Sequence, residues 1–348
     1  MVNYFILDCI LDTIRRSHIM GKEALPMDLH KRKGVTAVFE VFGLTLTKVG
    51  MLLIFIGIGY FLRRHHDLPD DAGHVLSLLC TLIFSPAYSI SNMSKNFTMD
   101  VLGKNILLIG YGVVFVLFSI GLSYLLSKPF AKSRIERNSL IYAFAIPNYG
   151  YFGYPVIEGV FGSTMLANVM IFLIPLSLTT NSFGYALFVG DKKIPWKKIL
   201  LSPLFICLVI GITIGLSGIQ LPAFLDNAIT AAGKCMSPCA MLLAGFMLGK
   251  FPLKDLLVGW RPYAYSVIRL IGIPVIFGTV LLLLGIKGQY LMLPLLVAGI
   301  PLGLNLVVYP ESQGHEKQAS DNAKLCFVSY LLALIILPCT FALLTYLA

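Results

Sequence analysis

Charged residues are scarce in this chain of 348 residues, and the shortage decides its class. Only 13% of the residues are Asp, Glu, Lys or Arg, against 57% hydrophobic residues and a mean hydropathy of +0.83. A water-soluble domain cannot hide that much apolar surface. The sequence therefore predicts an integral membrane protein whose solvent is the lipid bilayer.

Motifs for metal binding and catalysis are also missing. The seven cysteines are scattered, with no CxxC pair and no histidine at metal-ligand spacing. The chain lacks G-x-S-x-G, H-E-x-x-H and Walker-type glycine loops, and its histidines lie outside the apolar runs or at their ends. We therefore expect no metal, no cofactor, no catalytic residues and no enzymatic activity, and an ATP-driven pump is not indicated.

What the chain does have is a series of apolar runs of about 20 residues, the length of a membrane helix. The runs lie at roughly 43–62, 73–91, 105–127, 139–161, 164–189, 199–217, 223–249, 260–285, 289–309 and 325–347. Strand-like alternation is absent, which argues against a membrane barrel. The expected fold is all-α, a polytopic bundle of about ten transmembrane helices.

The formal net charge of +10 comes largely from lysines and arginines in short loops. They follow the odd-numbered spans, so the positive-inside rule places those loops in the cytoplasm and both termini outside, in a plasma or inner membrane. This pattern is a topology signal and not a nucleic-acid surface. Residues 1–42 form a basic N-terminal extension, and an N-terminus outside the cytoplasm contradicts the positive-inside rule for this segment. Either the native chain starts later, or the extension lies on the membrane surface.

An internal repeat is visible in the prolines. Ser85-Pro86 and Ser237-Pro238 are 152 positions apart, and Pro147 and Pro301 are 154 apart. This offset predicts two five-helix repeats at 43–190 and 199–348, joined by a cytoplasmic linker at 191–198. An odd number of crossings would make the repeats inverted.

Two apolar runs carry helix breakers in corresponding places of the two repeats. They read AIPNYGYFGYPVIEGVFG from Ala145 to Gly162 and AGIPLGLNLVVYP from Ala298 to Pro310. Proline removes a backbone donor and glycine weakens a helix, so both runs should unwind within the bilayer. Unwound backbone is tolerated there only beside a polar cavity or inside protein. Such a matched pair points to the binding site of a transporter.

These motifs resemble a known family. Asn148 to Pro155 is similar to the N-x-G-x-x-G-x-P signature in the fourth span of the auxin efflux carrier family, permeases for organic anions, and Pro301 to Asn305 resembles the ninth-span P-x-x-x-N. The resemblance implies that spans four and nine cross at their prolines. It also implies a scaffold of spans one, two, six and seven, a moving transport domain, and a substrate beside the crossover. Lys234 departs from it, because the family usually has neutral residues there.

The broken helices expose half-helix N-termini, which attract carboxylates, and asparagine adds amide groups without a buried charge. The predicted substrate-binding set is Pro147, Asn148, Gly150, Gly153, Pro155, Pro301, Gly303 and Asn305, with Ser85, Ser237 and Lys234. Alternatives stand beside this set. The asparagines could serve the backbone groups freed by the prolines, the glycines could pack the crossover, and the serines could cap carbonyls of the preceding turn.

Ionisable side chains inside spans are functional candidates. Lys48 lies near the outer end of its span, where a lysine can snorkel. Glu158 either carries a coupling proton or faces the interface. Lys234 either neutralises a substrate carboxylate, pairs with Glu158 or snorkels to a vestibule. Arg269 either pairs with a backbone carbonyl at a break or binds an anion.

The leading functional hypothesis is a secondary transporter that moves a small organic anion, a carboxylate or an auxin-like acid, by alternating access. Its energy would come from a coupling proton, a sodium ion or the substrate gradient. An anion channel and a sterol-sensing or ligand-sensing membrane protein are the alternatives. A homodimer is left open, and the sequence does not specify the substrate.

Overall fold

The computed structural model describes residues 35–66, 68–189 and 201–347, and these ranges are helical apart from turns and one isolated backbone bridge. Seven of their helices are long and apolar enough to cross a membrane, and 203–217 and 289–298 are shorter apolar helices. The predicted all-α polytopic fold is confirmed. The count of ten spans and the repeat stay predictions. The linker at 191–198 and most of the N-terminal extension lie outside the described residues.

The first half of the described chain contains twelve elements, of which those marked η are π-helical turns. They are α2 (Val35–Arg64), α3 (Ala72–Leu79), η1 (Cys80–Phe84), α4 (Ser85–Asn96), α5 (Met99–Asn105), α6 (Leu107–Ser127), α7 (Arg134–Ala145), η2 (Tyr149–Gly153), α8 (Tyr154–Phe172), α9 (Ile174–Thr179), η3 (Thr180–Gly184) and α10 (Tyr185–Val189). Predicted span one therefore already begins at Val35. Within α8, Gly162 has a φ of 83°, which kinks the helix where predicted span four ends.

The second half of the described chain follows the same pattern of long and interrupted helices. Its elements are α12 (Pro203–Ser217), α13 (Ala223–Lys234), α14 (Met236–Leu248), α15 (Leu253–Leu256), α16 (Trp260–Val267), η4 (Ile268–Gly272), α17 (Ile273–Leu283), α18 (Gln289–Ala298), α19 (Asn305–Ser312) and α20 (Glu316–Leu347).

Three of the π-turns end two residues before a proline. η1 precedes Pro86, η2 precedes Pro155 and η4 precedes Pro274. A proline has no N–H to donate and its ring clashes with the carbonyl four residues earlier. Widening the preceding turn relieves this mismatch, so the helix continues through the proline. Residues 72–96 consequently form one continuous helical run despite Pro86.

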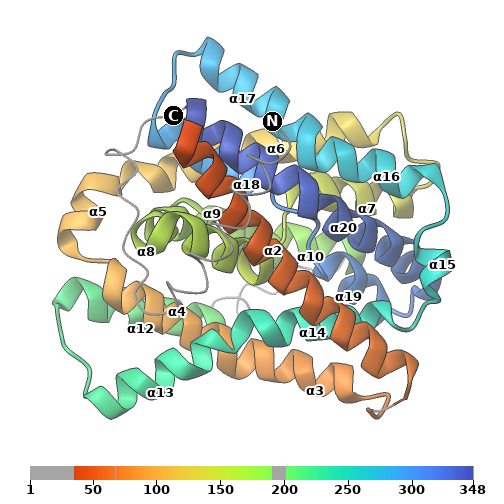
Figure 1. The fold of residues 1–348 in the computed structure, drawn as a ribbon, viewed down its shortest axis with the longest axis horizontal. Helices are drawn as coiled ribbons and strands as arrows, with labels where there is room; N and C mark the ends of the chain where they lie inside the picture. Colours follow the sequence, from red (N-terminus) through yellow and green to blue (C-terminus); the bar gives the residue numbers. More distant parts are fainter. Residues whose placement is uncertain (1–34, 67, 190–200, 348) are drawn as a thin grey trace, which may run out of the picture.

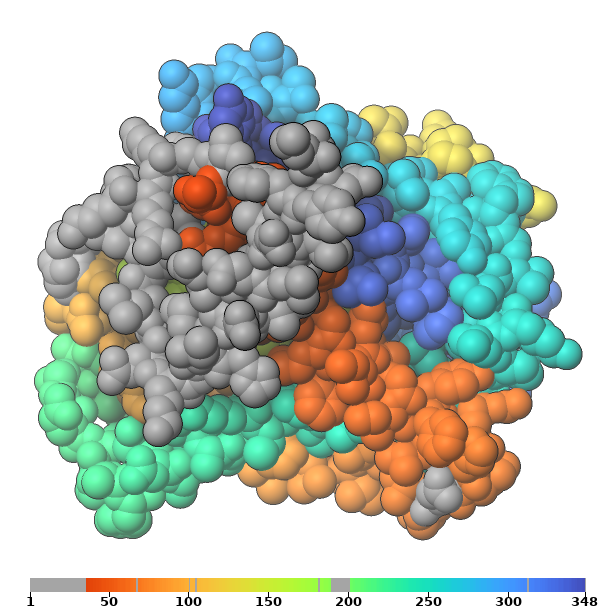
Figure 2. Space-filling view, viewed as in Figure 1, coloured from red at the N-terminus to blue at the C-terminus, as the bar shows by residue number. Residues whose placement is uncertain are grey.

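The helices form two layers (Figure 1). We call α2, α3, α4, α12, α13 and α14 the scaffold layer, and the remaining helices from α6 to α10 and from α16 to α20 the crossover layer. In this view α3, α4, α12, α13 and α14 lie along the lower side, while α2 crosses the front diagonally and also packs against α20. Figure 2 shows the same face filled, with the scaffold helices at its lower rim and α16 beside α20 on the right.

Glycines bring the scaffold helices into backbone contact. A Cβ on Gly245 of α14 would overlap the Ile56 carbonyl of α2, and a Cβ on Gly215 of α12 would lie 2.6 Å from the Met93 carbonyl oxygen of α4. The first span of each predicted repeat thus packs on the second span of the other. Two-fold related repeats would give this reciprocal packing, while the repeat itself remains a prediction.

Candidate functional site

The two predicted helix breaks are present, and they touch each other. α7 ends at Ala145, Ile146 is extended, and η2 begins only at Tyr149. α18 ends at Ala298, and α19 begins only at Asn305. Between the breaks, Pro147 and Leu302 form an antiparallel bridge, and the Asn148 N–H donates to the Pro301 carbonyl at 2.9 Å. The broken helices therefore cross through their unwound backbone, and we call this region the crossover.

Both asparagines bind tyrosine hydroxyls. Asn148 is 5% exposed, and its Nδ2 donates to the Tyr330 hydroxyl of α20 at 3.1 Å. Asn305 is partly buried, and its Nδ2 donates to the Tyr309 hydroxyl at 3.2 Å, one turn along α19. Among the described residues, both of these amide bonds go to side chains and neither goes to a backbone group freed by a proline. The asparagines instead connect the crossover to a set of tyrosines.

The predicted glycines and prolines have different surroundings. A Cβ on Gly153 would meet the tip of the Ile300 side chain in the other break, while a Cβ on Gly303 would lie in ordinary contact with Pro147, 3.6 Å from its carbonyl oxygen. A Cβ on Gly150 would meet nothing within 4 Å. Close packing at the crossover is therefore correct for Gly153 and wrong for Gly150. Pro155 lies at the start of α8, directly after η2, whose wider turn accommodates the missing N–H.

Arg269 forms hydrogen bonds through its side chain to the backbone of both breaks. Its side chain, on η4, is 1% exposed. Its Nη1 donates to the Phe144 carbonyl at 2.7 Å, and its Nε donates to the Ile300 carbonyl at 3.2 Å. The predicted pairing of Arg269 with a backbone carbonyl at a break is confirmed, and it occurs at both breaks. No carboxylate pairs with Arg269 in the part of the chain that the structure describes.

Glu158 and Lys48 lie where the scaffold layer meets α8. The Tyr88 hydroxyl of α4 donates to Glu158 Oε2 at 3.1 Å. The partly buried Lys48 side chain lies over Gly159, so close that a Cβ there would overlap its stem. Glu158 thus faces the seam between the layers, and its two predicted roles stay predictions.

Lys234 is exposed at the last residue of α13 and forms no ion pair with Glu158. The predicted pairing of these two residues is therefore wrong. Two predictions for Lys234 remain, snorkelling to a vestibule and neutralising a substrate carboxylate, because both need an exposed side chain.

The predicted capping by the two serines is also wrong. The Ser237 hydroxyl donates to the Tyr151 carbonyl of η2 at 3.0 Å, across the seam and not to its own preceding turn. The Ser85 hydroxyl is buried and has no hydrogen-bond partner among the described residues. It lies against the Tyr151 side chain. Both serines therefore face the turn that follows the first break.

Tyrosines are the site residues that the sequence analysis missed. Tyr88 stacks on Tyr154 with ring centroids 6.0 Å apart, and Tyr154 contacts Tyr149 at 5.8 Å. Tyr142 lies against Asn305. A tyrosine offers an apolar ring and one polar group, which suits a seam between membrane layers. The signal that could have revealed them is the repeated tyrosine in NYGYFGYP, beside unwound backbone.

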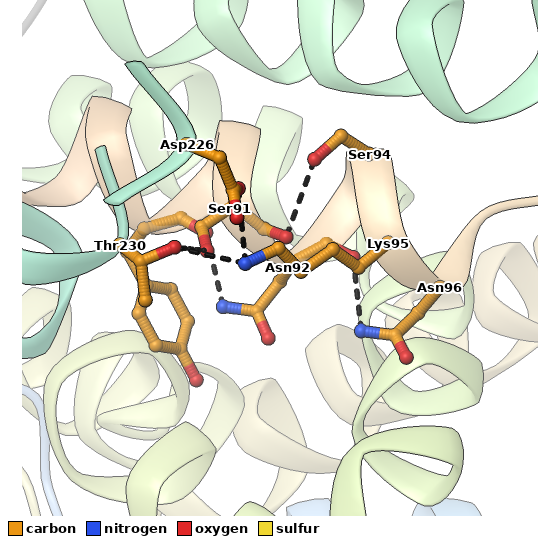
Figure 3. Close-up of polar contacts among 8 residues, drawn as sticks. Ser91, Asn92, Ser94, Lys95, Asn96, Asp226 and Thr230 are labelled. Atoms are coloured by element: carbon orange, nitrogen blue, oxygen red, sulfur yellow. Dashed lines mark hydrogen bonds and ion pairs between the residues drawn. The ribbon is translucent and has the colours of Figure 1, made fainter. Parts of the chain in front are cut away.

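A polar strip fixes Tyr88 in the scaffold layer (Figure 3). Lys95 Nζ lies 3.0 Å from Asp226 Oδ1 and donates to the Thr230 hydroxyl at 2.9 Å, so that α4 is tied to α13. The Asn92 side chain donates to the Tyr88 carbonyl at 3.0 Å. These bonds stay within one layer, and they hold the helix that presents the Tyr88 hydroxyl to Glu158.

A cavity of about 710 Å³ lies among the first turns of α7, α16 and α20. Its lining includes the ion pair of Arg261 and Glu136, whose Nη1 and Oε1 lie 2.9 Å apart. On its inner side the Asn322 amide donates to the Leu306 carbonyl of α19 at 2.7 Å. We place the candidate site at the crossover and not in this cavity, because the crossover is where the unwound backbone of the two predicted breaks meets.

Known proteins were compared with the chain as a whole. A family model described as membrane transport protein matches residues 44–192 and 186–341. A protein of Methanocaldococcus jannaschii that is named an uncharacterized transporter is 26% identical over 266 residues, which are 74% of this chain and 86% of that protein. The resemblance stated from the paired motifs is thereby confirmed. This chain belongs to the membrane transport protein family, the auxin efflux carriers, and is an integral multi-pass membrane protein of that transporter family.

Proposed function

We propose that this protein is a secondary transporter that carries a small organic anion, a carboxylate, by alternating access around the crossover. The observation that carries the proposal is the direct contact between the two breaks, through the Pro147–Leu302 bridge and the Asn148–Pro301 hydrogen bond. In a membrane such unwound backbone is tolerated only inside protein or beside a polar cavity, and a matched pair of breaks in two halves of a chain is typical of a transporter's substrate site.

The electrostatics of the crossover favour a negative ligand. The N–H groups of Gly303, Leu304 and Asn305 have no hydrogen-bond partner among the described residues, and they open α19 toward the break. The run from Tyr149 to Phe172 presents a second helix N-terminus. Helix N-termini carry partial positive charge and bind anions. The sequence has no Asp or Glu at 145–157 or at 298–310, so no acid there opposes an incoming carboxylate.

Side chains around the crossover supply further donors of the right kind. Asn148 and Asn305 each hold an amide there, and Gly150 leaves open space beside the turn that follows the first break. Amide and backbone N–H groups can bind a carboxylate without a buried cation of their own. Lys234, the last residue of α13, adds an exposed positive charge that assists entry of the anion.

Alternating access requires that one layer shifts against the other, and the polar bonds across the seam are few. Two connect the scaffold layer to the first crossover helix, from Tyr88 to Glu158 and from Ser237 to the Tyr151 carbonyl. The scaffold helices, by contrast, interlock through glycine contacts. A shift therefore breaks a small number of bonds at the seam and leaves each layer intact. Glu158 is positioned to carry a coupling proton through this movement.

The test is counterflow in proteoliposomes. Mono- and dicarboxylates, indoles and bile-type acids are first screened by thermal shift, and the anion that stabilises the purified protein most is used as labelled substrate. In a carrier, unlabelled substrate on the opposite side accelerates exchange. An anion channel gives flux without this acceleration, and a sensor binds the anion without flux. Either outcome would overturn the proposal. The matched control is the double variant Asn148→Ala/Asn305→Ala, which keeps the fold class and loses both amides.

A further inference from the structure

One buried cation serves the carboxyl ends of both broken helices. Arg269 is 1% exposed and bonds the Phe144 carbonyl at 2.7 Å and the Ile300 carbonyl at 3.2 Å. Phe144 lies in the last turn of α7, and Ile300 follows the end of α18. The two helices come from opposite halves of the chain, so this single side chain holds the two halves of the crossover together.

Two converging helix C-termini create an electrostatic problem inside a membrane. The last carbonyls of a helix have no intrahelical donor and carry partial negative charge. Bringing two such ends together in a medium of low dielectric constant costs free energy unless a cation lies between them. A bound metal ion is one solution, and a fixed positive side chain is another.

The residues present favour the fixed charge. The breaks contain no acidic side chain, so a cation bound between the two helix ends would be held by backbone carbonyls alone, and Arg269 already bonds two of these carbonyls. The guanidinium is planar and always charged, and its fork can reach two carbonyls at once. Its third nitrogen, Nη2, is buried and has no partner among the described residues. The positive charge of Arg269 is therefore balanced by carbonyl dipoles and not paired with a carboxylate.

We propose that Arg269 is a positioning residue that acts as the built-in counter-cation of the crossover. Its guanidinium takes the place that a bound sodium ion would otherwise fill between the two helix ends. The crossover of this protein then assembles without sodium. The inference deepens the proposed function, and its statement about coupling rests on that function. Transport of the anion is then independent of sodium. Glu158 is the group that remains to couple a proton.

Chemical rescue tests the proposal. Arg269→Ala is expected to lower the Tm of the purified protein by roughly 5–10 °C, because two helix ends lose their shared charged donor. Guanidinium at millimolar concentration, far below denaturing levels, should restore a large part of the loss, whereas sodium and N-methylglucamine at the same ionic strength should not. Arg269→Lys keeps the charge without the fork and should fall between wild type and Arg269→Ala.

The matched control is Arg261→Ala, in the same helical run. Arg261 pairs with Glu136 through a partly exposed contact at 2.9 Å, so guanidinium should not restore a specific site there. Rescue of both variants alike, or of neither, would overturn the proposal. If Arg269→Ala does not fold, Arg269→Lys decides: a Tm equal to that of wild type would show that the two-carbonyl fork is not needed.

The sodium dependence of uptake is a second test, because a residue with only a structural role would not affect it. Uptake by the wild type should be unchanged when N-methylglucamine replaces all sodium, and a strict sodium requirement would overturn the counter-cation role. The two proposals can fail separately. Specific rescue of Arg269→Ala without any anion transport would leave the role of Arg269 standing and remove the proposed function. Sodium-dependent anion transport would leave the proposed function standing and remove the counter-cation role of Arg269.

Discussion

The two helix breaks look equivalent in the sequence but differ in how the rest of the protein holds them. The first is short and tightly anchored, because Asn148 bonds Tyr330, and Phe152 stacks on the same tyrosine with ring centroids 5.8 Å apart. The second is longer: its Leu302 N–H donates to the Ser329 hydroxyl of α20 at 3.2 Å, while the Asn305 amide bonds one turn along its own helix or lies toward Tyr142. The first break is therefore anchored to α20 through its asparagine and the second through its backbone, which leaves the partly buried Asn305 amide more available to a ligand than the Asn148 amide.

The largest effect is expected from Asn148→Ala, which should abolish uptake while the protein is still expressed, and should also lower the Tm. The change leaves the buried Tyr330 hydroxyl without its partner, at a cost of about 1–3 kcal/mol. Uptake in proteoliposomes and thermal unfolding are the two measurements. Tyr330→Phe is the control, since it removes the same hydrogen bond, keeps Asn148 and should retain uptake. Wild-type uptake by Asn148→Ala would show that this amide does not serve the substrate.

Asn305→Ala should abolish uptake as well, but with little change in the Tm. Its partly buried amide bonds within α19, so its loss leaves the anchoring of the crossover to α20 intact. The pair of variants thus separates the two breaks by stability and not by transport. A fall in Tm as large as that of Asn148→Ala would contradict the difference that we draw between them.

A second contrast lies within the first break, between Gly153→Ala and Gly150→Ala. A Cβ at Gly153 forces the Ile300 side chain to move, which should destabilise the protein by about 1–2 kcal/mol. A Cβ at Gly150 enters open space and should leave the Tm unchanged while it lowers uptake, because the methyl group narrows the site. Thermal unfolding and uptake of both variants check this. Equal Tm values would remove the packing difference, and normal uptake by Gly150→Ala would move the substrate away from that turn.

The smallest effect is expected from Lys234→Met. An exposed charge near the seam contributes about 1 kcal/mol to anion binding, which corresponds to roughly fivefold in Kd. Binding of a neutral analogue should hardly change. Titrations of the anion and of the neutral analogue against both proteins give the comparison. If both ligands lose the same affinity, Lys234 acts on the structure and not on the charge of the substrate.

The sequence predicted the features that local chemistry determines. Proline and glycine in an apolar run identified both breaks, and a buried arginine in a span was expected to find a carbonyl. It did not predict the tyrosine partner of Asn148, because Asn148 and Tyr330 are far apart in the chain and meet only through tertiary packing. The prediction that the serines cap their own helix was wrong for the same reason, because Ser237 donates to a carbonyl of another helix. Pro86 also shows that a proline need not break a helix when a π-turn precedes it.

The most direct test of the account is a density map of the protein with a bound carboxylate, chosen by the thermal-shift screen. We predict density for the carboxylate beside the crossover, within hydrogen-bonding distance of the Asn305 amide and of the free N–H groups that begin α19. Density in the cavity among α7, α16 and α20 instead, with the crossover empty, would contradict it.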